Sequence, residues 1–503
     1  MFLDVINLMD KVEKQDNYSQ ILKYTGLFGG VQGLSILVGV VRNKLVASLL
    51  GTEGMGLVAL FNSTIKLLGD STNLGLSMSS VREISDSYGN DQKERLEHAV
   101  QLIRSWSLFT AIMGMLICLV FSPLLNRWVF SWGDHTLHFV FLSPVIALMA
   151  ITGGELAILK GTRQLRHLAA LSVYNVIAAF LIAVPLFYCW REAAIVPSIF
   201  FVSLAQMILT ISYSYRLFHP TFSFNKTIFR EGIGMVKLGI AFVLAGILGS
   251  GAEFLIRSYL NNAGSLDTVG LYNAGYMMTM VYAGMVFSAM ETDFFPRLSG
   301  IKGTGPELND VVNKQIEVCL LLISPMLVAF LVALPILLPL LYTGKFMPAL
   351  GMMQITVLAM YMRAIKLPIS YLPLAKGDSG VYLLMEGIYD VVVVILVILA
   401  YQYYGLTGTG AALAIASVFD FLMLYVCMHY VYHYDLSVNI LRYSMLQIPI
   451  GILAYLLTFF NYGWTYWTLG IVLSVISFFI SIKILHSKTR LWATLKKKIK
   501  RKR

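Results

Sequence analysis

Four cationic side chains interrupt long apolar stretches of the sequence, and their chemistry suits the binding of phosphate. Arg42 lies inside the apolar run "LVGVVRNKLVASLL", and Arg257, Arg363 and Lys366 lie in apolar segments further along the chain. The planar guanidinium of arginine can pair with two phosphate oxygens at once. We predict that these four residues line a site for a phosphate-bearing ligand. Lys44, near the end of its segment, can instead extend to the membrane surface.

Two further pairs of opposite charge are spaced four residues apart, which is one helical turn. They are Lys66 with Asp70, and Glu253 with Arg257. Residues at this spacing lie on one face of a helix and can form an ion pair. Each pair therefore has two interpretations: it neutralises itself inside the membrane, or it takes part in ligand binding. We include Lys66 and Asp70 among the candidate binding residues.

A group of acids near the C-terminal end of the chain has the chemistry of a coupling-ion site. Glu386 and Asp390 are one helical turn apart, and two close carboxylates in a low dielectric share a proton or hold a cation. Asp420, Thr407 and Thr409 could add oxygen ligands. The alternative is that Glu386 lies at the membrane surface. We predict Na⁺ or H⁺ as the coupling ion, with no other cofactor, no metal site and no catalytic residues.

The composition is that of an integral membrane protein. Of 503 residues, 57% are hydrophobic and 13% are charged, and the mean hydropathy is +0.73. Soluble domains carry about 25% charged residues. Much of the net charge of +11 lies in the C-terminal stretch "HSKTRLWATLKKKIKRKR". A basic tail after an apolar helix indicates contact with anionic lipid rather than with nucleic acid.

Fourteen apolar segments are long enough to cross a bilayer, which requires about 20 residues. Basic residues concentrate in alternate loops, such as those holding Arg82, Lys160 and Arg216, and the positive-inside rule places that side and both termini in the cytoplasm. We therefore predict a multi-pass membrane protein with both termini in the cytoplasm. The predicted spans are 22–50, 55–79, 101–125, 137–160, 168–189, 193–216, 233–261, 267–292, 315–341, 350–374, 380–403, 407–431, 440–460 and 464–485.

The chain contains an internal repeat at an offset of 214–216 residues. Arg42 matches Arg257, Gly56 matches Gly270, Arg82 matches Arg297, and two further matches follow in the same order. The offset covers an even number of spans, so the repeat is parallel, which is an arrangement found in transporters that rock two bundles around a central site. We predict an all-α fold of two six-helix lobes plus two additional C-terminal helices. The predicted divisions are a cytoplasmic N-terminal segment at 1–21, a first lobe at 22–216, a cytoplasmic linker at 217–232, a second lobe at 233–433, the additional helices within 440–485 and a basic cytoplasmic tail at 486–503.

Two stretches resemble the Wzx-type oligosaccharide flippases of the multidrug/oligosaccharidyl-lipid/polysaccharide exporter superfamily. "LLGTEGMGLVALFNSTIKLLGDSTNLGLSMSSVREIS" is similar to the opening helical pair of that family, and "GLYNAGYMMTMVYAGMVFSAMETDFFPRLSGI" to the start of its second lobe. The resemblance implies a V-shaped pair of bundles in the bacterial inner membrane. These bundles move undecaprenyl-diphosphate-linked oligosaccharide, such as an O-antigen or lipopolysaccharide unit, to the periplasmic leaflet. It also implies that the two additional helices form a hydrophobic groove, and that the acids of span 11 correspond to a sodium site. Glu386 departs from the amide expected there.

The sequence is compatible with several other functions. A lipid II flippase has the same architecture, and a cation-coupled multidrug antiporter would favour an acidic cavity, whereas the charges inside these spans are predominantly basic. A membrane glycan polymerase or ligase is disfavoured because no loop exceeds about 25 residues, so we predict that the protein is not an enzyme. We expect a monomer whose partners are membrane lipids, the lipid-linked oligosaccharide, a polysaccharide polymerase and glycosyltransferases.

Overall fold

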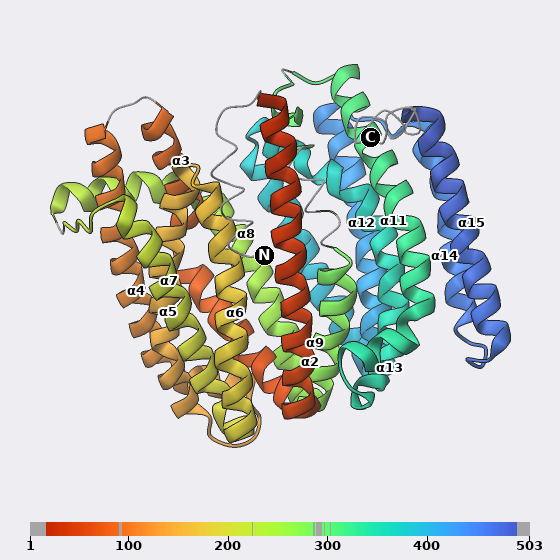
Figure 1. Cartoon of the computed structure of the whole chain (residues 1–503), viewed down its shortest axis with the longest axis horizontal. Helices are drawn as coiled ribbons and strands as arrows, with labels where there is room; N and C mark the ends of the chain where they lie inside the picture. The colour runs from red at the N-terminus through yellow and green to blue at the C-terminus, as the bar shows by residue number, and fades with distance from the viewer. Residues whose placement is uncertain are drawn as a thin grey trace, which may run out of the picture. The chain divides into compact units, whose positions relative to one another are not determined.

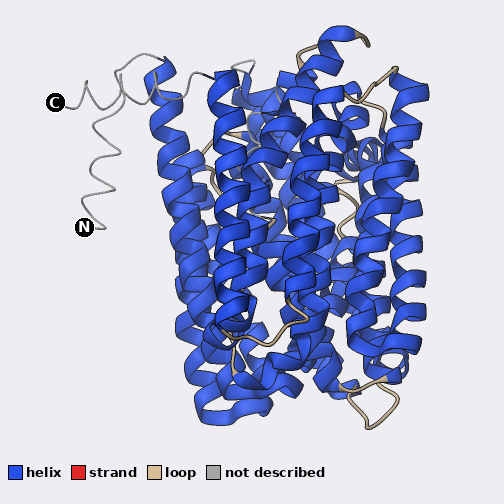
Figure 2. Cartoon of the chain, turned by 90° about the vertical axis from the view of Figure 1, so that its right-hand side faces the viewer, coloured by secondary structure: helices blue, strands red, loops and turns tan. Residues whose placement is uncertain are grey.

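The structure is a computed structural model that describes residues 17–89, 93–223, 225–284, 287, 294–295, 297–301 and 303–489. Every regular element in these ranges is a helix (Figure 1, Figure 2). Most of the predicted N-terminal segment and most of the predicted basic tail lie outside the described residues. The long helices are α2 (Asn17–Thr72), α4 (Lys93–Val129), α5 (Thr136–Gly161), α6 (Leu165–Trp190), α7 (Ile195–Leu217), α8 (Lys226–Ala263), α11 (Pro306–Leu341), α12 (Leu350–Lys376), α13 (Ser379–Tyr432), α14 (Val438–Leu457) and α15 (Trp464–Thr489). The shorter elements are α3 (Leu76–Gly89), α9 (Leu266–Tyr276), the 3-10 helices η1 (Arg191–Ala194) and η3 (Gly344–Ala349), and the π-helical turn η2 (Met277–Tyr282).

The predicted spans fall on these helices, although several helices are longer than one crossing needs. Within the described ranges, ten helical stretches are long and apolar enough to cross a membrane. Two of them, Arg166–Leu217 and Ser379–Tyr432, are 52 and 54 residues long. At 1.5 Å per residue each would measure about 80 Å, far more than the ~30 Å of a bilayer core. Each therefore contains two spans.

Left-handed backbone at single residues divides the long helices. Gly405 inside α13 has φ 59° and ψ −147°, and Gly51 inside α2 has φ 70° and ψ −164°. In α13 the chain folds back at this point. The two ends of the helix consequently lie together, and the Tyr432 hydroxyl donates to the Asp378 carboxylate over 3.1 Å. Counting α2 and α13 as two spans each gives fourteen. The eighth, formed by α9 and η2, continues into residues outside the described ranges.

The chain separates into two compact units. The first comprises residues 1–46, 75–117 and 141–239, and the second comprises 47–74, 118–140 and 240–503. The boundary passes through α2, α4, α5 and α8, so these units do not follow the lobes predicted from the repeat. The lobe boundaries therefore stay a prediction about sequence symmetry.

A buried ion pair joins helices of the first unit. The Arg104 guanidinium of α4 meets the Glu155 carboxylate of α5 through Nε–Oε1 and Nη2–Oε2 distances of 2.8 and 3.2 Å, and each residue is 2% exposed. The Ser214 hydroxyl donates to Glu155 over 2.5 Å, and the backbone carbonyl of His219 accepts from Arg104 over 2.6 Å. This network joins α4 and α5 to the end of α7.

In the second unit, α2 and α9 cross at two glycines that are equivalent in the repeat. A Cβ atom on Gly56 would lie 2.2 Å from the Leu266 carbonyl oxygen, and one on Gly270 would lie 2.0 Å from the Thr52 carbonyl oxygen. The Thr52 hydroxyl also donates to Asp267, and these residues are 215 apart in sequence. Small residues allow such close approach of membrane helices. The crossing brings the two halves of the repeat together at matching positions.

This crossing predicts that Gly56→Ala destabilises the protein by about 1–3 kcal/mol, the usual cost of overpacking. The obstructing atoms belong to backbone, so α2 and α9 would have to separate. The measurement is the thermal unfolding of the purified protein in detergent. Gly69→Ala is the matched control, because a Cβ on this other α2 glycine meets nothing within 4 Å. Equal unfolding temperatures for the two variants would contradict the prediction.

The C-terminal helices α14 and α15 pack on α11 of the second unit (Figure 1). The Tyr466 hydroxyl of α15 donates to the Val332 carbonyl over 2.9 Å, and Gly470 lies against the Val332 side chain. Between α14 and α15, the buried Gln447 amide exchanges hydrogen bonds with Ser477 and Ser481. Buried polar groups that are satisfied in this way fix the two helices in one register.

Candidate binding site

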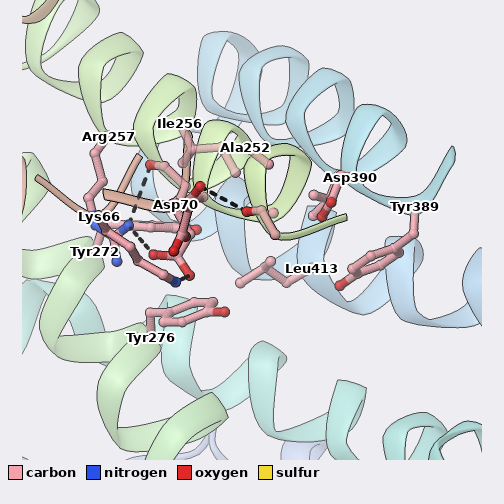
Figure 3. Close-up of a pocket in the computed structure, with 15 residues that line it drawn as sticks. Lys66, Asp70, Ala252, Ile256, Arg257, Tyr272, Tyr276, Tyr389, Asp390 and Leu413 are labelled. Atoms are coloured by element: carbon pink, nitrogen blue, oxygen red, sulfur yellow. Dashed lines mark hydrogen bonds and ion pairs between the residues drawn. The ribbon is translucent and has the colours of Figure 1, made fainter. Parts of the chain in front are cut away.

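A small polar cavity of about 290 Å³ lies among α2, α8, α9 and α13 in the second unit (Figure 3). Ligand sites usually measure about 300–1,000 Å³, so this one suits a headgroup rather than a whole oligosaccharide. Its apolar wall includes Ile256, Val393 and Leu413. The polar side chains that line it are Lys66, Asp70, Ser250, Glu253, Arg257, Asp390 and three tyrosines, Tyr272, Tyr276 and Tyr389.

One carboxylate in this cavity binds two cations. Glu253 Oε2 lies 3.1 Å from Arg257 Nη1, one turn along α8, and Glu253 Oε1 lies 2.9 Å from Lys66 Nζ of α2. The predicted pair within α8 is therefore present, while Lys66 reaches across to α8 instead of to Asp70. Arg257 also donates to the Asn273 side chain of α9 over 3.3 Å. These ion pairs and this hydrogen bond join α2, α8 and α9 at the cavity.

Tyrosine hydroxyls provide the other hydrogen-bonding groups of the cavity. Tyr272 and Tyr276 lie one turn apart on α9, with ring centroids 6.1 Å apart. The helix begins at a cap where Ser265 Oγ accepts from the Thr268 N–H over 3.3 Å, which sets the register that directs both tyrosines to one side. Tyr389 faces the cavity from α13 (Figure 3). A tyrosine hydroxyl can donate to a phosphate or a sugar oxygen.

A second charged group lies behind Tyr389. The Lys366 ammonium of α12 forms an ion pair with Asp420 in the second half of α13, and it lies 4.4 Å from the centroid of the Tyr389 ring. Lys366 is outside the cavity lining and is paired. Arg363, one turn earlier on α12, donates to the Met280 carbonyl over 2.9 Å and is also outside the lining. Of the predicted cations in this unit, Lys66 and Arg257 reach the cavity.

Asp390 carries a buried oxygen without a partner. Its Oδ2 atom makes no hydrogen bond within the described part of the chain, and it would lie 3.7 Å from a Cβ on Gly249 of α8. A buried carboxylate oxygen that is left unsatisfied is costly, so such a group usually meets a proton, a cation or water. Glu386, one turn away, is half-buried.

Thr407 and Thr409 lie too far along α13 to assist these acids. Asp390 and Asp420 are each fifteen residues from the break at Gly405, whereas the threonines are two and four residues from it. Eleven residues separate Thr409 from Asp420, which is about 16 Å of helix. The Thr409 hydroxyl bonds to the Leu406 carbonyl, and Thr407 lies near Gly351. The grouping of these threonines with the acids is therefore corrected.

Arg42 lies in the first unit and does not line this cavity. Its guanidinium is half-buried and donates to the Asn43 side chain over 3.2 Å. The predicted site residues of the second unit comprise four cations and four carboxylates, and Glu253 adds a fifth carboxylate. The excess of positive charge expected from the sequence is thus not found in this unit.

Comparisons with known proteins identify the family. Residues 21–302 match the model of a family described as "Polysaccharide biosynthesis protein". This match covers more than half of the chain. The chain belongs to the polysaccharide biosynthesis protein family. No curated protein matches the chain significantly.

The fold of this polysaccharide biosynthesis protein is shared with solved transporters. An inward-facing multidrug resistance MATE family transporter of the MOP superfamily aligns with a TM-score of 0.65 and 16% identity, over 79% of this chain and 94% of that one. The lipid II flippase MurJ aligns with a TM-score of 0.61 and 16% identity, over 92% and 99% of the two chains. A MOP superfamily transporter from Pyrococcus furiosus aligns with a TM-score of 0.57 and 14% identity, over 80% and 94%. The predicted all-α membrane-transporter fold is confirmed.

Sequence reasoning missed the tyrosines of this family member's cavity and the Arg104–Glu155 pair. Tyr272 and Tyr276 are one helical turn apart in span 8, and this spacing could have predicted two hydroxyl groups on one face of the helix. Arg104 and Glu155 fall inside the predicted spans 101–125 and 137–160, so their charge in an apolar segment was itself a signal.

Proposed function

We propose that the protein is a flippase for a polyprenyl-diphosphate-linked oligosaccharide, moving it from the cytoplasmic to the periplasmic leaflet of the bacterial inner membrane. The observation that carries this proposal is a cavity within the membrane helices of a polysaccharide biosynthesis family member that presents Lys66, Arg257 and three tyrosines together. A lysine, an arginine and hydroxyl donors are the groups that bind diphosphate and the adjoining sugar. We propose undecaprenyl diphosphate as the carrier, both termini in the cytoplasm, and a monomer that cooperates with glycosyltransferases and a polymerase.

An apolar groove between α11 and α15 supports the lipid part of this proposal. It measures about 520 Å³ and is lined mainly by aliphatic and aromatic side chains, including Leu322, Met326, Val475 and Phe478. Such a surface favours a hydrocarbon chain. We propose that the polyprenyl tail lies along this groove while the diphosphate enters the polar cavity and the bundles alternate between inward-open and outward-open states.

Asp390 supports coupling to an ion gradient. A carboxylate oxygen that lacks a partner, one turn from the carboxylate of Glu386, can take up a proton or Na⁺. Asp420 is already paired with Lys366, so we assign the coupling role to Glu386 and Asp390 rather than to all three acids.

Lipid II is the second candidate substrate. The alignment with the lipid II flippase MurJ extends over 92% of this chain, whereas the alignment with the multidrug MATE transporter extends over 79%. Lipid II carries the same kind of lipid diphosphate but adds a peptide. The two candidates therefore differ in the headgroup and not in the diphosphate that Lys66 and Arg257 would bind.

The test is transbilayer movement in proteoliposomes that contain the purified chain and a fluorescent undecaprenyl-diphosphate oligosaccharide. We expect dithionite to quench label that starts in the inner leaflet, faster than in protein-free vesicles, and faster still under an imposed Na⁺ or H⁺ gradient. The Glu386→Gln/Asp390→Asn variant is expected to lose the gradient response. Movement of labelled lipid II alone would favour the second candidate, and no movement of either lipid would refute the flippase proposal.

A further inference from the structure

We propose that Glu253 is a resident anion that occupies the place of the substrate's phosphate in the empty cavity and is exchanged for it on binding. This inference rests on the proposed function, because it takes a diphosphate as the ligand. Its basis is the geometry of one carboxylate between two cations that come from different helices.

The Glu253 carboxylate has the shape of a phosphate contact. Each of its oxygens accepts from a different cation, Oε1 from Lys66 at 2.9 Å and Oε2 from Arg257 at 3.1 Å. A phosphate group would bind the two cations in the same way, with two oxygens of one central atom each paired with a different cation. The same two cations cannot keep both contacts with Glu253 and bind a phosphate in that position.

The exposure of the three side chains fits an exchange. Arg257 is 9% exposed and fixed by Asn273, whereas the Glu253 and Lys66 side chains are 32% and 49% exposed. Arg257 therefore provides a rigid anchor, and the more accessible carboxylate can swing away. The tyrosines of the cavity offer hydroxyl groups to a phosphate ligand. Glu253 does not use these groups, because both of its oxygens are paired with cations.

Charge balance explains why the empty cavity needs such a group. An uncompensated cation in a membrane helix costs about 2.5–3.5 kcal/mol on insertion scales. In the empty cavity the Glu253 carboxylate offsets one of the two positive charges of Lys66 and Arg257 and contacts both. When it swings away, a diphosphate supplies negative charge to the same two cations, so neither cation is left without an anion. The repeat supports a dedicated role, because Arg257 has Arg42 as its counterpart, while the position matching Glu253 is Val38.

The exchange also releases a tie between the halves of the repeat. Lys66 belongs to α2 of the first half and Glu253 to α8 of the second. When a phosphate replaces Glu253, the direct contact between these two helices is replaced by one through the substrate. Substrate binding thereby changes what joins the two helices at the cavity.

The test measures binding of inorganic pyrophosphate to the purified full-length protein by titration calorimetry. Glu253→Gln is expected to bind pyrophosphate at least tenfold more tightly than the wild type, because the binding-competent state no longer competes with an internal ion pair. Asp70→Asn removes another carboxylate from the same cavity. Because we do not propose that Asp70 occupies the phosphate position, this variant should gain clearly less affinity for pyrophosphate. Asp310→Asn, which breaks the exposed Asp310–Lys314 pair on α11, is the control for net charge and should bind like the wild type.

The outcomes separate this inference from the proposed function. Unchanged binding in Glu253→Gln, or equal gains in Glu253→Gln and Asp70→Asn, would overturn the exchange, even if the proteoliposome assay shows transport. Absence of transport by the wild type would refute the flippase proposal, whereas a selective gain in Glu253→Gln would still establish that Glu253 competes with phosphate. Loss of the gain in Glu253→Gln/Arg257→Ala would support the exchange, because it places the pyrophosphate on Arg257.

Discussion

Replacing Arg104 with alanine is expected to destabilise the protein by about 3–5 kcal/mol, the usual result of leaving a buried charge without its partner. Glu155 would keep its Ser214 hydrogen bond but lose both guanidinium contacts, and at 2% exposure it has no access to solvent. The carbonyls of Phe218 and His219 would lose their donor as well. We expect a large fall in the yield of folded protein from membranes and a lower unfolding temperature in detergent.

The matched control is the double variant Arg104→Met/Glu155→Met. Replacing both partners of a buried ion pair with apolar side chains is often neutral or stabilising, because no charge remains to be compensated. We therefore expect the double variant to recover much of the stability that Arg104→Ala loses. A single variant with the wild-type unfolding temperature would show that the pair contributes little to the first unit.

The helices could be predicted because a bilayer imposes length and apolarity on each crossing separately. Fourteen spans followed from hydropathy alone, including the two halves of α13, since Gly405 interrupts an apolar run with a residue that tolerates left-handed backbone. The division into compact units could not be predicted, because it depends on which helices pack together rather than on the repeat.

The charged pairs show where prediction from the sequence stops. Glu253–Arg257 is a contact within one helix and follows from a spacing of four residues. Lys66–Glu253 and Lys366–Asp420 join residues on different helices, with separations of 187 and 54 residues in the sequence. Lys66 has an acid at the favourable spacing in its own helix and still contacts Glu253, because tertiary packing presents that carboxylate to it.

The repeat did not predict which of its equivalent positions lie in contact. Thr52 with Asp267, and Gly56 with Gly270, are contacts between positions that match in the repeat, so equivalent segments of the two halves contact each other. The charges do not obey this symmetry. Glu253, Lys66 and Asp390 have Val38, Val281 and Asn175 at the matching positions, so the repeat does not provide a second copy of these three charges.

Replacing Arg257 with alanine is expected to reduce transport of the lipid-linked oligosaccharide at least tenfold in the proteoliposome assay. Arg257 is the buried cation of the cavity, and its guanidinium is held by both Glu253 and Asn273. Arg257→Lys keeps the charge but loses the planar fork, so it should retain part of the activity. Because the side chain is buried, the unfolding temperature of each variant must be measured beside its transport rate.

The comparison with Arg363 makes the prediction specific to the cavity. The sequence predicts the same loss for Arg363→Ala, but the structure places Arg363 outside the cavity lining, on the Met280 carbonyl. We therefore expect a smaller loss of transport in Arg363→Ala than in Arg257→Ala. If folded Arg257→Ala transports at the wild-type rate, the cavity does not bind the diphosphate. If the two variants lose transport equally at equal stability, both arginines contact the substrate. The substrate site would then extend beyond this cavity toward α12.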